Sequence, residues 1–220
     1  MEKFGTEELE SKRKVLSEED ARAVETVEKG TRKMNPGYEV PIPWKPDQPQ
    51  LNNNRQVALQ RLNGLLKRFT KEPEYEKEYR VAVRKYLDEG YARKITEPAE
   101  LDHPKQWFLP HHGVYKKSAE RKIFRIVFDA TVGYNGRSLN NSMLTGPEGT
   151  TRNPMFRQRP IAFGADIEAM FSKIRLTKED ARHHRFLMTD PETGRVEVFQ
   201  LDRLTFGDGA SPFVVMATLH

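Results

Sequence analysis

The sequence predicts an α+β protein. Apolar residues recur at helical spacing between residues 53 and 90, whereas strand patterns begin at Trp107. A proline-containing stretch precedes both. Helices gathered in one part of a chain and strands in another are typical of α+β folds.

Composition limits the classes of function open to the chain. It has 220 residues, a formal net charge of +5 and no cysteine. The absence of cysteine excludes disulfides, thiolate zinc sites and a cysteine nucleophile, and the positive charge permits a polyanionic partner. No apolar run reaches membrane-spanning length, and the polar start Met1–Gly5 is not a signal peptide. We therefore expect an intracellular, non-secreted protein with no membrane partner.

Residues 1–50 are predicted to form a leader or linker before the main fold. Ser17 supplies an N-cap hydroxyl and Gly30 a stop, so a helix is expected over Ser17–Lys29. Prolines at 41, 43, 46 and 49 then hold the chain extended. Trp44 within this stretch indicates docking on another surface, and a plain spacer is the alternative.

Two amphipathic helices are predicted between residues 53 and 90. The first has an apolar stripe from Ala58 to Phe69, with Asn53 or Asn54 as its cap, and the second begins at Pro73. Their opposite faces carry basic side chains: Arg61, Lys67, Arg68, Lys71, Lys77, Arg80, Arg84 and Lys85. A basic face is either a solvated surface or a nucleic-acid contact, and both interpretations stay open.

Strands are predicted over Gln106–Pro110, Gly113–Lys116 and, most strongly, Ile123–Asp129. Within the last of these, Arg125 and Val127 share one face, so one guanidinium lies on a face of a well-buried strand. A structural ion pair with Asp129, two positions further along that face, is the plain interpretation of Arg125.

The last third of the chain predicts a helical turn, a hairpin and a helix. Thr177 has capping-box spacing to Asp180. His184–Met188 and Arg195–Leu201 are expected to pair as antiparallel strands. A small-residue loop leads to an apolar helix over Phe213–Leu219.

Ile161–Ile174 predicts a short buried strand followed by a helix, whose apolar face would carry Ile167, Met170, Phe171 and Ile174. Asp166 lies at the junction between the two. A carboxylate in that position either caps the helix or binds a divalent cation, because Mg²⁺ prefers oxygen ligands. The local pattern alone leaves both roles open.

Two familiar chemistries do not fit the sequence. The histidine pairs at 111–112 and 183–184 consist of adjacent residues, whose side chains point apart, so neither pair closes on one zinc ion. Ser211 lacks the Gly-x-Ser-x-Gly elbow of a serine hydrolase. What remains is an acidic residue after a strand, cations at Lys116, Lys117 and Arg125, and a glycine-rich turn, an inventory that fits phosphate chemistry.

Five sequence segments, in order, resemble the reverse transcriptase of BEL/Pao-type LTR retrotransposons. They are Trp107-Phe108-Leu109-Pro110-His111-His112, Phe124-Arg125-Ile126-Val127-Phe128-Asp129, Ser138-Leu139-Asn140, Ala165-Asp166-Ile167-Glu168-Ala169-Met170-Phe171 and Phe206-Gly207 through Ser211-Pro212-Phe213. Tyr38–Trp44 and Leu51–Arg55 are similar to the segment that precedes the polymerase in the same polyproteins. The resemblance covers nearly the whole chain.

The resemblance implies a domain arrangement. It is that of an incomplete right-hand polymerase of the α+β class, preceded by a helical, proline-containing leader over residues 1–50. The fingers would occupy residues 51–146. A partial palm would occupy residues 147–220, with a fingers hairpin near 184–201, and would stop before the hairpin that carries adjacent aspartates.

The resemblance also implies roles for individual residues. Asp166 would be the first catalytic, metal-binding aspartate, with the Ile167 carbonyl beside it and Mg²⁺ or Mn²⁺ as the cofactor. The dNTP would be bound by Arg125, Lys117 or Lys116, the backbone of Ala169 and Met170, and the ring of Phe171, which would exclude ribonucleotides. Gly207, Ser211 and Pro212 would support the template and primer. Phe206 departs from the glutamine of many reverse transcriptases.

The implied partners are an RNA or DNA template with its primer, dNTPs and the rest of the retroelement polyprotein. Two-metal nucleotidyl transfer needs more than one carboxylate, and the others of the family lie on the hairpin of adjacent aspartates. We therefore expect this chain alone to be inactive in polymerisation. The alternative is a non-catalytic nucleic-acid-binding or interaction protein derived from a retroelement.

Overall fold

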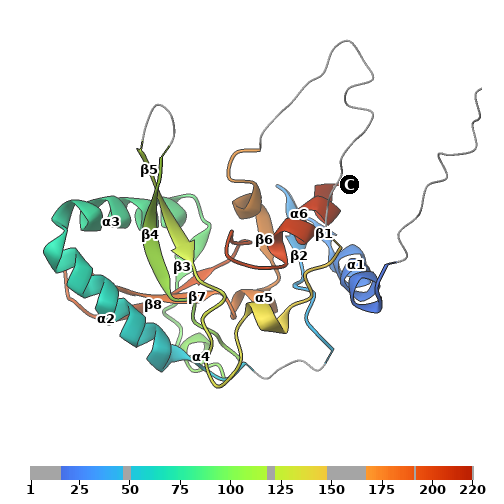
Figure 1. Cartoon of the computed structure of the whole chain (residues 1–220), viewed down its shortest axis with the longest axis horizontal. Helices are drawn as coiled ribbons and strands as arrows, with labels where there is room; N and C mark the ends of the chain where they lie inside the picture. The colour runs from blue at the N-terminus through green and yellow to red at the C-terminus, as the bar shows by residue number, and fades with distance from the viewer. Residues whose placement is uncertain (1–15, 47–50, 118–121, 148–166, 191, 220) are drawn as a thin grey trace, which may run out of the picture.

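The computed structural model describes residues 16–46, 51–117, 122–147, 167–190 and 192–219. It is a mixed α+β structure, which confirms the predicted fold class. The described strands form a sheet in the order β1-β2-β6, a sheet in the order β3-β8-β7 and the two-stranded hairpin β4-β5 (Figure 1). The predicted strand over residues 161–165 lies outside the described residues.

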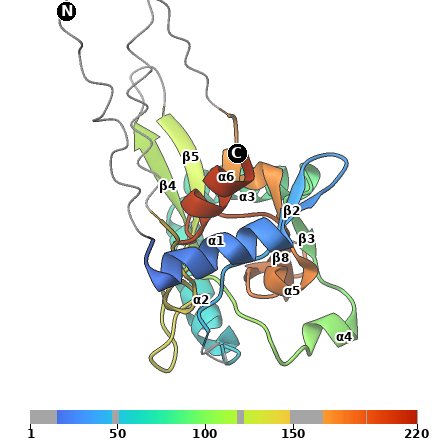
Figure 2. The same ribbon diagram turned by 90° about the vertical axis from the view of Figure 1, so that its right-hand side faces the viewer.

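The leader helix forms as predicted. Helix α1 spans Glu18–Gly30, and the Ser17 hydroxyl accepts a hydrogen bond of 3.0 Å from the Asp20 amide. Ala23 and Val27 on its inner face are buried, and α1 packs against the last helix, α6 (Ser211–Leu219) (Figure 2).

The proline-containing stretch is docked on the rest of the protein. Strand β1 (Arg32–Lys33) turns into β2 (Tyr38–Val40), which pairs in parallel with β6 (Ile174–Leu176). The carboxylate of Asp180 in α5 (Lys178–Ala181) then accepts hydrogen bonds from the Ile42 amide at 3.0 Å and from Trp44 Nε1 at 2.7 Å. Residues 16–46 therefore share one core with the segments that follow.

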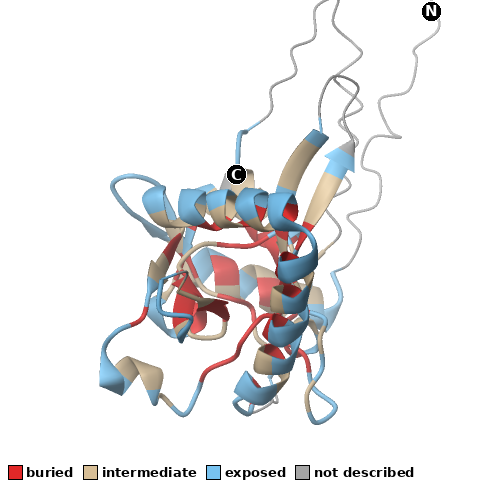
Figure 3. Cartoon of the chain, turned by 90° about the vertical axis from the view of Figure 1, so that its left-hand side faces the viewer, coloured by how far each residue is buried: buried red, intermediate tan, exposed pale blue. Residues whose placement is uncertain are grey.

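Helices α2 (Arg55–Lys71) and α3 (Pro73–Asp88) confirm the two predicted amphipathic helices. Their apolar stripes are buried and their opposite faces are largely exposed (Figure 3). Asn54 precedes α2, but its side chain does not cap the helix. It binds both backbone groups of Phe108 instead, at 2.7 Å and 2.8 Å.

Residues 106–110 are not a strand, so that prediction is wrong. The buried backbone of these residues forms hydrogen bonds with the Asn54 side chain and with the backbone of Arg182 and Arg185. Phe108 also forms an isolated β-bridge with Arg185. The strand begins later, because β4 (His111–Lys117) includes both histidines and pairs with β5 (Lys122–Phe128) in a hairpin.

The predicted α-helix over residues 167–174 is also wrong. Ala169 has a φ of 52°, Met170–Lys173 form a short 3₁₀ turn (η3), and Ile174 already belongs to β6. The apolar residues at helical spacing belong to two different elements. Met170 and Phe171 lie in the 3₁₀ turn, whereas Ile174 lies in β6, which pairs with β2.

The predicted elements of the last third are confirmed, whereas the short elements at residues 92–94, 98–101 and 140–142 have no counterpart in the prediction. Thr177 caps α5 by accepting from the Asp180 amide at 3.2 Å. Strands β7 (Arg185–Thr189) and β8 (Val196–Leu201) form the expected hairpin, with β3 (Ala92–Lys94) on the other edge of β8. Short helical segments occupy Pro98–Leu101 (α4) and Asn140–Ser142 (η1), and α6 begins two residues before the predicted start.

Candidate functional site

The β4-β5 hairpin places Lys116 and Arg125 on one face. Arg125 pairs with Val114, and Lys116 follows two positions after Val114, so these three side chains lie on the same side of the hairpin. The opposite side carries Phe124, which packs edge-to-face on Tyr75 of α3 at 5.4 Å between ring centroids. The two cations therefore face away from α3 and toward solvent.

Arg125 lies on a less buried strand than predicted. Its side chain is exposed, and burial along β5 is confined to Ile126 and Phe128 near its end. The suggested partner Asp129 binds Thr131 instead, because its Oδ1 accepts from the Thr131 amide at 2.9 Å and from the hydroxyl at 2.5 Å. The backbone of Lys117 pairs with Lys122, and the Lys117 side chain lies outside the described residues.

The base of the hairpin is held by a neutral histidine. The Tyr79 hydroxyl donates to His111 Nδ1, and His111 Nε2 donates to the Leu187 carbonyl at 2.8 Å. Burial lowers the pKa of His111 to about 4, although the bond to Leu187 opposes this shift. His112, the next residue, is exposed, as expected for neighbours on a strand.

Asn140 connects two of the five motif segments, the one that ends at Asn140 and the one that begins at Phe206. Its Nδ2 donates to the Gly207 carbonyl at 3.2 Å, and its Oδ1 accepts from the Gly209 amide at 2.9 Å. The loop 205–211 is thereby tied to residues 138–142, about 70 positions earlier in the chain. In the sequence, Asn140 is recognisable only as the last residue of the Ser138-Leu139-Asn140 motif, which assigns it no role.

Gly207 presses this loop against the end of β5. A Cβ at position 207 would lie 2.0 Å from the Phe128 carbonyl oxygen. Because that neighbour is backbone, the contact leaves no space for any side chain. Gly207 therefore brings the loop 205–211 beside the strand that carries Arg125.

A buried ion pair fixes the same loop from its other side. His184 Nε2 lies 2.9 Å from Asp208 Oδ2 and Nδ1 lies 3.1 Å from the Asp180 carbonyl oxygen, with both side chains of the pair fully buried. Both nitrogens face acceptors, so both must donate and the ring is an imidazolium. Burial lowers the pKa of His184, but the charge and hydrogen bond of Asp208 outweigh it, and the pKa is raised.

The predicted template and primer residues open α6. Ser211 is fully buried and its hydroxyl has no partner among the described residues, whereas Pro212 is exposed. The Ser211 amide donates to the Asp208 carbonyl at 3.2 Å. The ion pair therefore positions the start of α6 as well as the loop.

Asp166 lies outside the described residues, so neither its cap role nor its metal role is tested. Ile167 and Ala169 are exposed, and Met170 is half-buried in the 3₁₀ turn. Phe171 packs edge-to-face on Phe206, with 5.6 Å between ring centroids and an interplanar angle of 81°. Phe206 itself is 79% exposed.

The described residues do not form a metal site by themselves. Within the described ranges, no group of three or more histidine, aspartate or glutamate side chains is placed so that it could hold a metal ion.

Several structurally central polar residues have no recognisable sequence signal. His184 and Asp208 are 24 positions apart, and the sequence around Asp180 predicts only a place in the first turn of a helix. The capping-box spacing of Thr177 and Asp180 predicts the cap of α5. It does not predict the two hydrogen bonds that the Asp180 carboxylate accepts from Ile42 and Trp44. Polar contacts between distant segments depend on the fold and leave no local pattern.

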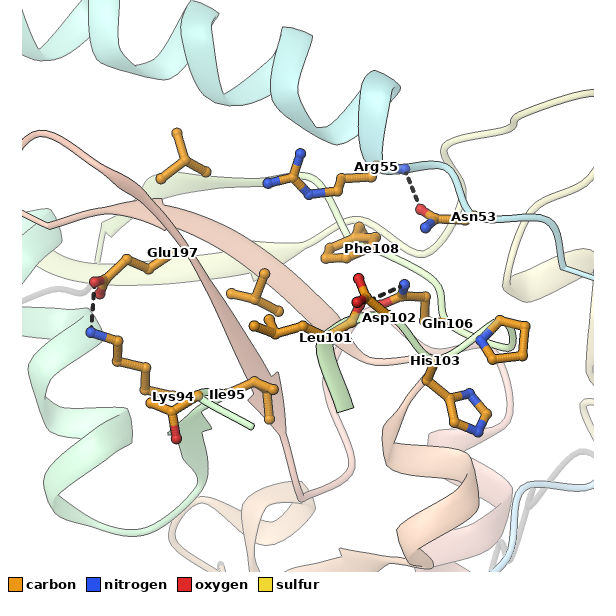
Figure 4. A pocket seen from close by; sticks show the side chains of 14 residues that line it. Asn53, Arg55, Lys94, Ile95, Leu101, Asp102, His103, Gln106, Phe108 and Glu197 are labelled. Carbon is orange, nitrogen blue, oxygen red and sulfur yellow. Dashed lines mark hydrogen bonds and ion pairs between the residues drawn. The ribbon is translucent and has the colours of Figure 1, made fainter. Parts of the chain in front are cut away.

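A cavity of about 730 Å³ lies elsewhere in the described part of the chain (Figure 4). Its lining includes Arg55, at the start of α2, and the ion pair between Lys94 and Glu197, which is 2.6 Å long. Among its described lining residues there is none of the predicted site residues. A second cavity, about 470 Å³, lies between α2 and the hairpin base, beside Arg61 and His112.

The chain matches no protein-family model and no curated protein. None of the described helices is both long and apolar enough to cross a membrane. Its function is therefore inferred from the motif series and from the geometry of these residues.

Proposed function

We propose that this chain forms the fingers and the first part of the palm of an RNA-directed DNA polymerase similar to the reverse transcriptases of BEL/Pao-type retrotransposons. The observation that carries the proposal is the meeting of separate motif segments around one loop. Asn140 binds both Gly207 and Gly209, Gly207 packs on Phe128, and Phe206 packs on Phe171.

The cations of the hairpin support a triphosphate role. Lys116 and Arg125 share the face that is turned away from α3, and Arg125 lies three residues before the contact of Phe128 with Gly207. A guanidinium binds phosphate oxygens in a bidentate manner. Because Lys116 lies on the Arg125 face, we assign the triphosphate contact to Lys116 rather than to Lys117.

The substrates of the proposal are dNTPs and a primed RNA or DNA template. Phe171 would meet the sugar, where an aromatic ring leaves no room for a 2′-hydroxyl. Asp166 and the Ile167 carbonyl would hold Mg²⁺ or Mn²⁺ together with the aspartate pair of the family, and the ions would neutralise charge that develops on the phosphates. The protein would act inside the cell, in a cytoplasmic particle or the nucleus, within the retroelement polyprotein.

Primer extension tests the proposal. The protein to assay is the polyprotein segment in which this chain is continued to the expected Asp-Asp pair, with an RNA template, a DNA primer and Mg²⁺. We expect RNA-templated DNA synthesis that Asp166→Asn abolishes. Extension that is unchanged by Asp166→Asn would contradict the metal role of this residue.

The second candidate is a non-catalytic nucleic-acid-binding protein, favoured by the exposed basic residues of α2, α3 and the hairpin. For this 220-residue chain we expect affinity for a primer–template duplex that falls steeply with salt concentration. Arg125→Gln and Lys116→Gln should each reduce the slope of log affinity against log salt by about one. Exposed Lys105→Gln, outside the hairpin, is the control. Binding that ignores salt would count against this function.

A further inference from the structure

A row of charged side chains crosses the sheet β1-β2-β6 on its outer face. Arg32 pairs with Glu39, Glu39 pairs with Arg175, and Arg175 forms an isolated antiparallel bridge with Arg203. Residues in register across strands project on the same side of a sheet. Their chain neighbours Val40, Ile174, Leu176 and Leu204 are buried on the inner side, so the row faces outward.

The acidic groups near this row already have partners. Glu39 is ion-paired with Arg32. Asp202 Oδ2 lies 3.2 Å from Arg93 Nε, and Asp202 Oδ1 accepts from Gln200 Nε2 at 2.8 Å. Among the described residues, neither Arg175 nor Arg203 is within ion-pair distance of a carboxylate. The two guanidinium groups are therefore adjacent cations, and the charge of Asp202 offsets their repulsion at Arg203 only in part.

Arg203 bears an electrostatic cost in this arrangement. Its Nε atom is buried and has no hydrogen-bond partner among the described residues. Burial and the neighbouring charge of Arg175 lower the pKa of Arg203. Like charges opposite each other on a sheet are destabilising, so an external anion bound between the two guanidinium groups would relieve the repulsion.

We propose that the outer face of the sheet β1-β2-β6, through Arg175 and Arg203, binds the phosphate backbone of a nucleic acid. Arg175 and Arg203 lie about 5 Å apart across one antiparallel bridge, so their two guanidinium groups can contact neighbouring phosphates of one strand. Arginine contacts phosphate with two parallel N–H donors. This surface is formed by the sheet β1-β2-β6 and the adjoining Arg203. It is separate from the β4-β5 hairpin, which carries Arg125.

Binding of a fluorescein-labelled oligothymidine, measured by anisotropy at several salt concentrations, tests the site. Arg175→Gln and Arg203→Gln should each weaken binding several-fold and reduce the salt slope by about one. Arg195→Gln is the charge-matched control, since Arg195 is exposed in the turn before β8, beyond the opposite end of that strand from Arg203. Equal effects of Arg175→Gln and Arg195→Gln would overturn the proposal.

Stability separates a binding role from a structural one. Removing one of two adjacent cations should raise the Tm of the free protein, by about 1–3 °C for Arg175→Gln. A lowered Tm together with weaker binding would overturn the proposal, because the arginine would then be structural. Orthophosphate should compete no better than chloride at matched ionic strength. Displacement of the oligothymidine by orthophosphate alone would overturn the assignment to a nucleic-acid backbone.

Discussion

Asp208→Asn is expected to lower the free energy of unfolding by about 3–5 kcal/mol at pH 7, the usual cost of breaking a buried ion pair by removing one partner. The variant leaves the His184 imidazolium fully buried beside the Asp180 carbonyl without its counter-charge. Urea unfolding followed by circular dichroism measures the change.

The same pair predicts how stability depends on pH. The pKa of His184 is raised in the folded protein, so its contribution is complete below the ordinary histidine pKa, about 6.5, and is lost as pH rises through the raised value. His111 and His183 act in the opposite direction. Burial lowers their pKa values to about 4 and about 3, so the protein loses stability as pH falls from the ordinary value toward these.

His184→Gln provides the control for this dependence, because it removes the titrating group and keeps a polar side chain. Its stability should vary less between pH 7 and pH 9 than that of the wild type. The double variant His184→Gln with Asp208→Asn should lose less stability than the sum of the two single variants. Parallel pH curves for wild type and His184→Gln would contradict a charged His184.

Gly207→Ala is expected to destabilise the protein by about 1–3 kcal/mol, the typical cost of overpacking. The added methyl would lie 2.0 Å from the Phe128 carbonyl oxygen, so either the loop 205–211 or the end of β5 must move. A movement of the loop would also strain the two bonds from Asn140. Thermal unfolding should register a Tm lowered by about 2–4 °C per kcal/mol.

Gly64→Ala is the matched control for that substitution. Gly64 lies within α2, is exposed, and has nothing within 4 Å of an added Cβ. Alanine in an exposed helix interior is favoured over glycine by up to about 1 kcal/mol, so this variant should be more stable than the wild type. If both variants changed the Tm in the same direction, the contact of Gly207 with Phe128 would not be the cause.

The local elements were predictable where one segment supplies the whole pattern. Helix α1 carries its own cap, helices α2 and α3 carry their own apolar stripes, and the β7-β8 hairpin carries its own turn. Prediction failed at residues 106–110 and 167–174. In both places the conformation depends on a partner far away in the chain, Asn54 and Arg185 for the first and β2 for the second.

The candidate site was predictable as a set of residue types but not as an arrangement. Strand alternation placed Arg125 on one face of its strand, and the register with β4 then added Lys116 to that face. The contacts of Asn140 with Gly207 and of Phe171 with Phe206 join residues whose sequence neighbourhoods give no hint of each other.

The sequence by itself determined the α+β class, the amphipathic helices, the basic charge and the ordered motif series that motivates the polymerase proposal. These properties are local or compositional, since periodicity, capping and charge are written in neighbouring residues. Only the tertiary structure decided that Asp180 anchors the leader, that His184 carries a charge and that Arg175 lies beside Arg203. Each of these depends on burial and on register between segments distant in the chain, which a local pattern does not encode.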